Sequence, residues 1–250
     1  MIKKITVAAL VTSLVGFAGS VNAAAGDVTV TFGYAQSSAT GLKKDVNYYG
    51  GAVREGQGVA SEIRGIAASE GFIVPAENVV SKAGKYSDPR GVTAKVRYEF
   101  TDEWGIIGAL TYLSSSASGR MYSENAAGDV AETVFGHGEI NSTYYSVQAG
   151  PTYRVNDYVS AYAMAGLATA KVERYFNYEY QQPGKQANGK PYPRKSGTLL
   201  RDNERKTQLT YSAGLQFNVY SGLTLDVAYE GSGSGDWKTS GFNVGLGYKF

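Results

Sequence analysis

Charged side chains at alternate positions are the most unusual feature of one short segment. Lys95, Arg97 and Glu99 alternate with apolar residues over residues 91–100. A repeat of two is that of a β-strand, so the three charges share one face of it. Burying that face in an apolar core would cost a large desolvation energy unless the charges were paired. Two kinds of chemistry fit such a face: a path for protons or ions, or a closed network of ion pairs.

Three other segments alternate in the same way, and their polar phase carries carboxylates and amides. The simplest arrangement puts the apolar faces against lipid and the polar faces inside a closed barrel. Because side chains fill the bore of an eight-stranded barrel, we expect a structural network rather than a path. The predicted interior network consists of Lys95, Arg97, Glu99, Gln148, Gln216, Asp226 and Glu230.

His137 is the only histidine and the best candidate for a general base. In principle it could pair with Ser142 or a loop carboxylate, as in a lipid-modifying enzyme at the membrane rim. Its neighbours, Gly136 and Gly138, are more typical of a solvated glycine-rich loop. The chain has no cysteine, which excludes disulfides and thiolate metal sites. We therefore expect no enzyme, no catalytic residue, no metal site and no cofactor, and keep the rim enzyme as a remote alternative.

Residues 171–206 form a basic segment, with nine Lys and Arg against four Asp and Glu and with aromatic residues between them. This composition suits sulfated glycans, lipopolysaccharide phosphates or acidic surfaces of host proteins. The alternative is that Lys and Arg near the membrane rim bind the lipopolysaccharide of the cell itself. The preceding loop, residues 115–141, is acidic instead. The candidate extracellular binding patch consists of Lys185, Lys190, Tyr192, Arg194, Lys195 and Arg201.

The elements that must position these residues are β-strands. The chain has 250 residues with 20 Tyr and 32 Gly, a composition typical of an all-β protein. We expect the last strand to pair with the first, because closing a barrel removes both edges. The alternation leaves the phase of the third and fifth strands unassigned. The predicted strands cover residues 28–34, 91–100, 104–114, 142–155, 158–172, 207–219, 223–230 and 239–250.

The connections between these strands are short and long in turn. This order is the signature of an outer-membrane barrel with short periplasmic turns and long extracellular loops. Aromatic residues beside the short turns suit a girdle at the membrane interface. A soluble barrel would invert the pattern and place its apolar residues inside. The fold class is therefore an all-β, eight-stranded antiparallel transmembrane β-barrel. Its long loops are expected at about 35–90, 115–141, 173–206 and 231–238, with one short helix at 60–69.

The N-terminal segment is typical of a signal peptide. Lys3 and Lys4 precede an apolar run over residues 5–18, and Ala23 ends a cleavage-site pattern. Cleavage there leaves a barrel of residues 24–250 with 22 Lys and Arg against 22 Asp and Glu, so the charge gives no reason to expect nucleic-acid binding. We expect a monomer in the bacterial outer membrane with its loops at the cell surface. Outer-membrane lipid, lipopolysaccharide and the barrel-assembly machinery are its expected partners.

Several strand motifs carry a family resemblance. Tyr144-Tyr145 with residues 149–157 (AGPTYRVND), residues 96–100 (VRYEF) and the ending 247–250 (GYKF) resemble the Ail/OmpX/Lom family of enterobacterial outer-membrane proteins. The resemblance implies host-cell or matrix adhesion, invasion, or complement (serum) resistance, through loops that contact matrix or complement-regulatory proteins. The loop at 35–90 is longer than the family's, so its residues take no role from the resemblance. The alternative is a structural envelope barrel without a dedicated ligand.

Overall fold

The computed structural model describes residues 25–71, 79–125, 132–182, 184–220 and 222–250. The expected signal peptide, residues 1–23, lies outside the described residues. The elements, in chain order, are β1 (Val28–Ala39), α2 (Thr40–Glu55), α3 (Gln57–Ser69), β2 (Val79–Ala83), β3 (Arg90–Glu99), β4 (Trp104–Asn125), β5 (Glu132–Asn156), β6 (Val159–Gln181), β7 (Lys195–Tyr220), β8 (Leu223–Ser232), η1 (Gly235–Trp237) and β9 (Thr239–Lys249).

Eight of these strands close an antiparallel ring. Its order is β4-β3-β1-β9-β8-β7-β6-β5, and β5 pairs back with β4. The first and last strands close the ring, from Thr29 opposite Lys249 to Ala39 opposite Thr239. The predicted eight-stranded barrel is therefore confirmed. The short strand β2 lies outside the ring and pairs with the outer part of β4.

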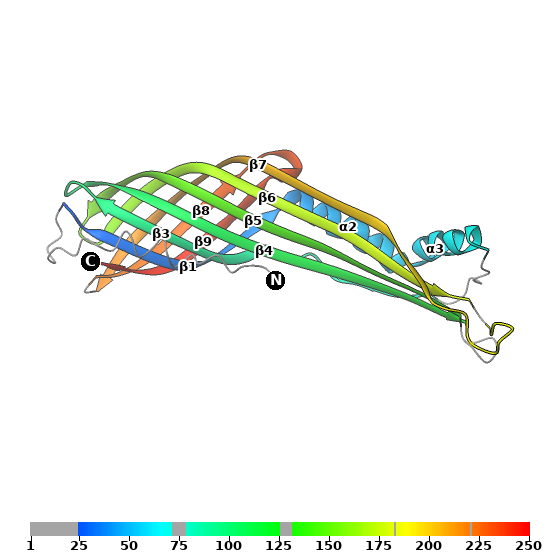
Figure 1. Cartoon of the computed structure of the whole chain (residues 1–250). Helices are drawn as coiled ribbons and strands as arrows, with labels where there is room; N and C mark the ends of the chain where they lie inside the picture. The colour runs from blue at the N-terminus through cyan, green and yellow to red at the C-terminus, as the bar shows by residue number, and fades with distance from the viewer. Residues whose placement is uncertain (1–24, 72–78, 126–131, 183, 221) are drawn as a thin grey trace.

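The wall of the barrel has two heights (Figure 1). Strands β1, β3, β8 and β9 have 10 to 12 residues, close to the 9–11 that cross a bilayer. Strands β4 to β7 have 22 to 26 residues. At about 3.4 Å per residue, β5 is about 80 Å long. We call the part beyond the short wall the extension: residues 114–125, 132–143, 171–181 and 195–206.

The extension differs from the sequence prediction of loops at 115–141 and 173–206. Most of both segments is β-strand, in continuous register from Ser114 opposite Thr143 to Asn125 opposite Glu132. The strands persist because their inner face is apolar and is covered. Met121, Val134 and Phe176 lie buried on that face.

The outer face of the barrel is apolar, and its phase is now clear in every strand. In β4, Ile106 points outward and Ile107 inward, while in β6 Leu167 points outward and Met164 inward. Aromatic pairs occur at two levels. Trp104 packs on Tyr153 near the short turns, with ring centroids 4.9 Å apart, and Tyr112 packs on Tyr145 below the extension at 5.0 Å. These levels suit the two girdles of a transmembrane barrel.

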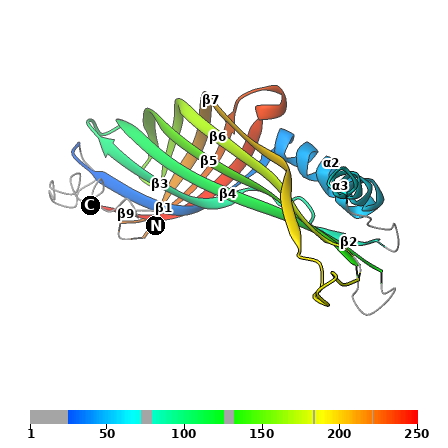
Figure 2. The same cartoon turned by 45° about the vertical axis from the view of Figure 1, so that its right-hand side comes forward.

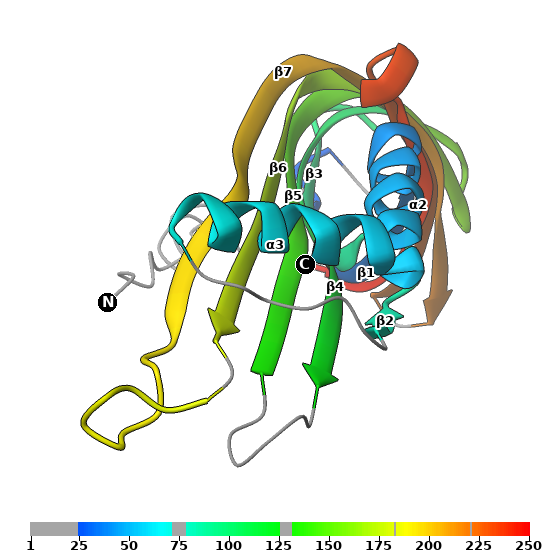
Figure 3. The ribbon, with the colours of Figure 1, turned by 90° about the vertical axis from the view of Figure 1, so that its right-hand side faces the viewer.

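Two helices cover the inner face of the extension, and we call them the cap (residues 40–69). Figures 2 and 3 show α2 beside the barrel mouth, and Figure 3 shows α3 crossing the strands of the extension. In α2, Leu42 and Val46 pack on Ile140 and Val172. In α3, Ala60, Ile63 and Ala67 join the buried cluster of the extension. The expected helix at 60–69 is confirmed but begins at Gln57, and α2 was not expected. Among the described helices, none has the length and apolar character that a membrane span requires.

Candidate extracellular binding surface

Lys95, which is 1% exposed, is the centre of a cluster in the lumen. This cluster lies farther from the short turns than Arg97 and Glu99 do. The ammonium group of Lys95 forms an ion pair with Asp226 on the opposite wall. It also donates to Asn243 Oδ1 and to the Tyr162 hydroxyl, each at 2.6 Å. Tyr162 in turn donates to the Asp226 carboxylate at 3.0 Å. Lys95 and Asp226, both expected in the interior network, therefore meet across the lumen.

A second cluster lies toward the short turns. The buried guanidinium of Arg97 is 3.2 Å from Glu99 Oε1, and Glu99 also pairs with Arg154. Arg154 lies 3.4 Å from Asp27, which Lys249 approaches to 3.2 Å. Sequence reasoning missed Asp27, Arg154 and Lys249 as interior groups. The signal was present for two of them, because Arg154 and Lys249 occupy the polar phase of their strands.

The remaining predicted interior residues lie between and above these clusters. Glu230 accepts hydrogen bonds from Thr111, Tyr144 and Ser146, at 3.1, 2.9 and 2.7 Å. Gln148 Oε1 accepts from Ser212 at 2.7 Å, and Gln216 Nε2 lies 3.5 Å from Thr31 Oγ1. Among the described residues, four cations face four carboxylates in the lumen, so the interior charges balance: Lys95, Arg97, Arg154 and Lys249 with Asp27, Glu99, Asp226 and Glu230.

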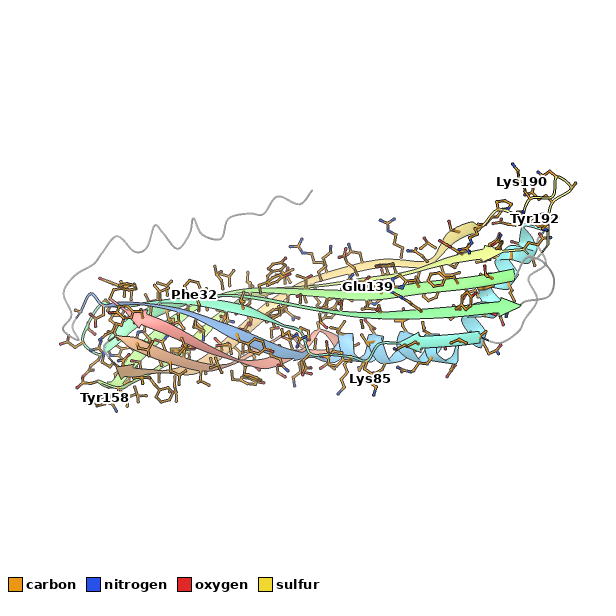
Figure 4. All side chains as sticks on the ribbon, turned by 90° about the horizontal axis from the view of Figure 1, so that it is seen from below. Phe32, Lys85, Glu139, Tyr158, Lys190 and Tyr192 are labelled. Atoms are coloured by element: carbon orange, nitrogen blue, oxygen red, sulfur yellow. The ribbon has the colours of Figure 1, made fainter. Side chains whose placement is uncertain are left out.

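The far end of the extension carries three of the basic residues of the candidate patch: Lys185, Lys190 and Arg194. We call the described part of residues 182–194 the tip. Figure 4 shows Lys190 and Tyr192 there, at the opposite end of the molecule from Tyr158. Lys185 pairs with Pro191 in an isolated bridge, and the Tyr192 carbonyl accepts from Gln181 at 2.9 Å. Arg194 Nη1 lies 3.8 Å from Glu179 Oε2. The tip therefore presents exposed cations on a short, internally bonded loop.

Lys195, unlike the basic residues at the tip, contacts the cap. It points to the cap and pairs with Glu70, just after α3, at 2.5 Å. The Tyr180 hydroxyl donates to the same carboxylate at 2.8 Å. These two hydrogen bonds lower the pKa of Glu70 from its ordinary 4.5. Burial and the bond to Glu70 raise the pKa of Tyr180 to about 12. Lys195 thus ties the cap to the extension.

Arg201 does not lie with the other patch residues. It follows Lys195 by six positions along β7, which is about 20 Å in a strand. Its register partner is Tyr175 on β6. Tyr175 donates to Glu139 on β5, and this bond raises the pKa of the phenol. Arg201 therefore belongs to the outer face of the extension, and the predicted patch divides into the tip, Lys195 and Arg201.

His137 lies in strand β5 rather than in a loop. Its ring contacts Tyr175 edge-on, with centroids 6.2 Å apart. Ser142, five positions further along the strand, is buried on the opposite face, so the two cannot pair. Among the described residues, no three His, Asp or Glu side chains converge as a metal site.

His137 was expected in a loop because glycine-rich segments are typical of loops. Cβ atoms on Gly136 and Gly138 would lie 2.6 and 2.7 Å from the ring of Phe176. The two glycines therefore make room for that ring on the inner face of the strand.

A closed antiparallel ring with an apolar outer face, two aromatic levels and a charged interior defines a transmembrane β-barrel of the bacterial outer membrane. A family model described as enterobacterial Ail/Lom protein matches residues 59–250. The chain belongs to the Ail/Lom family, as the strand motifs predicted. The protein is therefore an outer-membrane protein.

Two relatives and one solved structure illustrate the similarity. The outer membrane protein lom of Escherichia phage lambda is 37% identical over 163 residues, which cover 64% of this chain and 73% of the relative. The attachment invasion locus protein of Yersinia pseudotuberculosis is 34% identical over 165 residues, which cover 65% and 72%. The crystal structure of Ail, the attachment invasion locus protein of Yersinia pestis, has a TM-score of 0.48 and 25% identity over 90% of this chain and 99% of that chain.

Proposed function

We propose that this protein is a surface adhesin whose tip binds acidic, sulfated glycans on host cells or matrix. The observation that carries the proposal is the height of the extension. Strands β6 and β7 hold the tip at the far end of the molecule from the short turns (Figure 4). A family relative is named an attachment invasion locus protein, which supports a role in attachment.

The chemistry of the tip supports an anionic partner. Lys185, Lys190 and Arg194 are exposed on a loop of about a dozen residues, with Tyr192 among them. Sulfate groups are fixed negative charges, and clustered cations attract them at a range set by the salt concentration. Lys195 is not part of the proposed contact because it holds Glu70.

The test is the binding of heparin to the purified barrel in lipid nanodiscs, at low and at physiological salt. A variant with Lys185, Lys190 and Arg194 changed to Ser should lose about tenfold in affinity, since three exposed charge contacts are removed. The loss should shrink as salt rises. The same variant displayed on cells should adhere less to heparan sulfate.

The matched control removes the same charge elsewhere. Lys43, Lys82 and Lys85 are exposed on the cap side of the molecule, and changing them to Ser should leave heparin binding unchanged. Equal losses in both variants would mean attraction by net charge alone. Unchanged binding in both would contradict the adhesin proposal and favour a structural envelope barrel.

A second candidate contact, with lipopolysaccharide phosphates, is favoured by one observation. Lys171 and Arg205 lie directly opposite each other on β6 and β7, two positions beyond Thr169 and Thr207. Like charges in cross-strand register destabilise a sheet unless an anion lies between them. Glu173 takes part of this role, 2.7 Å from Lys171. Arg205→Ser should weaken lipopolysaccharide binding without affecting heparin, which separates this contact from the tip.

A further inference from the structure

An apolar hollow of about 270 Å³ lies between the cap and the inner face of the extension. One wall is formed by α2 and α3, with Val53 and Val59. The other is formed by the strands, with Ile140, Phe176 and Leu200. An apolar cavity of about 150 Å³ is large enough to bind benzene, so this one can hold an aromatic side chain with space to spare.

Carboxylates outnumber the cations that line or border the hollow, which include Arg174 and Arg54. At one end, the Arg174 guanidinium binds three carboxylates: Asp45 at 3.0 Å, Asp202 at 2.7 Å and Glu204 at 3.6 Å. One guanidinium offsets one of these charges, and the side chains of Asp202 and Glu204 are 44% and 51% exposed. Glu62 of α3 lines the hollow as well. An apolar group that enters the hollow therefore meets a local excess of negative charge.

We propose that this hollow binds a soluble, extended peptide in which an aromatic or aliphatic side chain is flanked by arginine or lysine. The apolar side chain enters between α2 and the strands. The basic neighbours lie beside Asp202, Glu204 and Glu62. The site selects positive charge, whereas the tip selects negative charge, so the two surfaces are independent.

Part of one wall of the hollow lies outside the family match. The match to the Ail/Lom family begins at residue 59, so α2 lies outside it. Without α2, the hollow would lose the wall that includes Val46 and Val53. The proposal therefore rests on the contacts of α2 with the strands and not on the family match.

The test uses nanodiscs that contain the full barrel and a fluorescein-labelled Arg-Phe-Arg-Leu-Arg peptide, with binding read by fluorescence anisotropy and empty nanodiscs subtracted. Three comparison peptides replace the apolar residues by Ser, the Arg residues by Ser, or the Arg residues by Glu. Arg-Phe-Arg-Leu-Arg should bind most tightly. Equal binding of the peptide without apolar residues would show attraction by charge alone. Equal binding of the peptide with Ser in place of Arg would show an unselective apolar pocket. Either result would overturn the proposal.

Two variants locate the contact. Ala52→Trp places a large ring at the exposed lining of α2 and should weaken binding about tenfold, because it fills the space for the apolar anchor. Asp202→Asn with Glu204→Gln should weaken it about threefold or more while Asp45 still holds Arg174. The control Glu173→Gln removes a carboxylate that pairs with Lys171, away from the hollow, and should change nothing.

The outcomes separate this site from the adhesin. The Lys185, Lys190 and Arg194 variant should bind the peptide as the unaltered protein does, and the Ala52→Trp variant should still bind heparin. Unchanged peptide affinity in both hollow variants, with the barrel folded by gel mobility, would rule the site out even if the tip binds heparin. A second copy of the chain as the occupant would appear as nanodiscs joined in pairs, with the peptide unable to compete.

Discussion

The buried charges of the barrel interior are compatible with a stable fold only when each one keeps a partner of opposite charge. Lys95 and Asp226 are each 1% exposed and are 131 positions apart in the chain. Such a pair adds little net stability compared with an apolar pair, but losing one partner leaves the other charge buried and uncompensated. The lumen therefore tolerates balanced changes better than single ones.

Lys95→Met should lower the free energy of unfolding by about 3–5 kcal/mol, because the Asp226 carboxylate stays buried without its cation. Adding Asp226→Leu should recover most of that loss. Guanidinium unfolding in lipid vesicles, followed by tryptophan fluorescence, measures both.

The matched control is Lys44→Met, since the Lys44–Asp236 pair is 68% and 66% exposed. Exposed pairs of this kind contribute about 0–1 kcal/mol. A loss at Lys95 no larger than the loss at Lys44, or a double variant as unstable as the single one, would contradict this view of the lumen.

Within the extension, glycines set how closely the strands approach the ring of Phe176. A Cβ on Gly136 would lie 2.6 Å from Phe176 Cζ. Gly136→Ala should push the ring out of the cluster that includes Ile63 of α3 and destabilise the cap by about 1–3 kcal/mol. Limited proteolysis of the cap reports the change.

Gly65→Ala in α3 is the control, because nothing lies within 4 Å of its Cβ position. It should strengthen the helix by about 0.5–1 kcal/mol and slow cleavage. If both alanines slow cleavage, Phe176 is not the limiting contact.

The attachment of α3 depends on pH through Glu70. Its pKa is lowered by hydrogen bonds from Lys195 and Tyr180, so the docked cap favours the carboxylate. A lowered carboxyl pKa gives stabilisation that is complete above the ordinary value of 4.5 and is lost as the pH falls through the docked-state value. Hydrogen exchange of α3 amides, corrected for intrinsic rates, should therefore quicken below about pH 4.5.

Glu70→Gln removes the titrating group and should abolish this pH dependence while leaving a weaker hydrogen bond to Tyr180. Retention of the full pH dependence in Glu70→Gln would assign it to another group.

Strand periodicity predicted the barrel because one face meets lipid and the other meets charges, so the alternation is strict in every predicted strand except 104–114 and 158–172. The extension was harder to predict. Residues 114–119 are small and mostly polar, so β4 shows no alternation there. Phe176, Tyr178 and Tyr180 do alternate with Asn177 and Glu179, but the charges around them suggested a loop. The division of the basic patch could not be predicted either, because Lys195 meets Glu70 only once α3 has folded over the strands.

The whole molecule consists of a barrel and a cap that form separate apolar clusters. In the lumen, Ile107, Tyr162 and Ala228 belong to one cluster. The cap instead packs with the extension, around Ile63 and Phe176. Gln36 of β1 lies opposite Arg90 of β3, so a short hairpin turn could join these strands directly.

Replacing residues 37–89 by such a turn should therefore leave the barrel closed. The variant should keep the heat-dependent gel mobility of the folded barrel, since among the described residues the ring loses only the pairing of β1 residues 37–39 with β9 and the backbone hydrogen bond from Ser37 to Pro89. Its extension should become sensitive to protease and bind an apolar dye, because Met121, Val134 and Phe176 lose their cover. A variant that fails to close would show that the cap assists barrel folding. A variant with a closed barrel and a protected extension would show that the four long strands are stable alone, and the cap would then serve only to form the hollow.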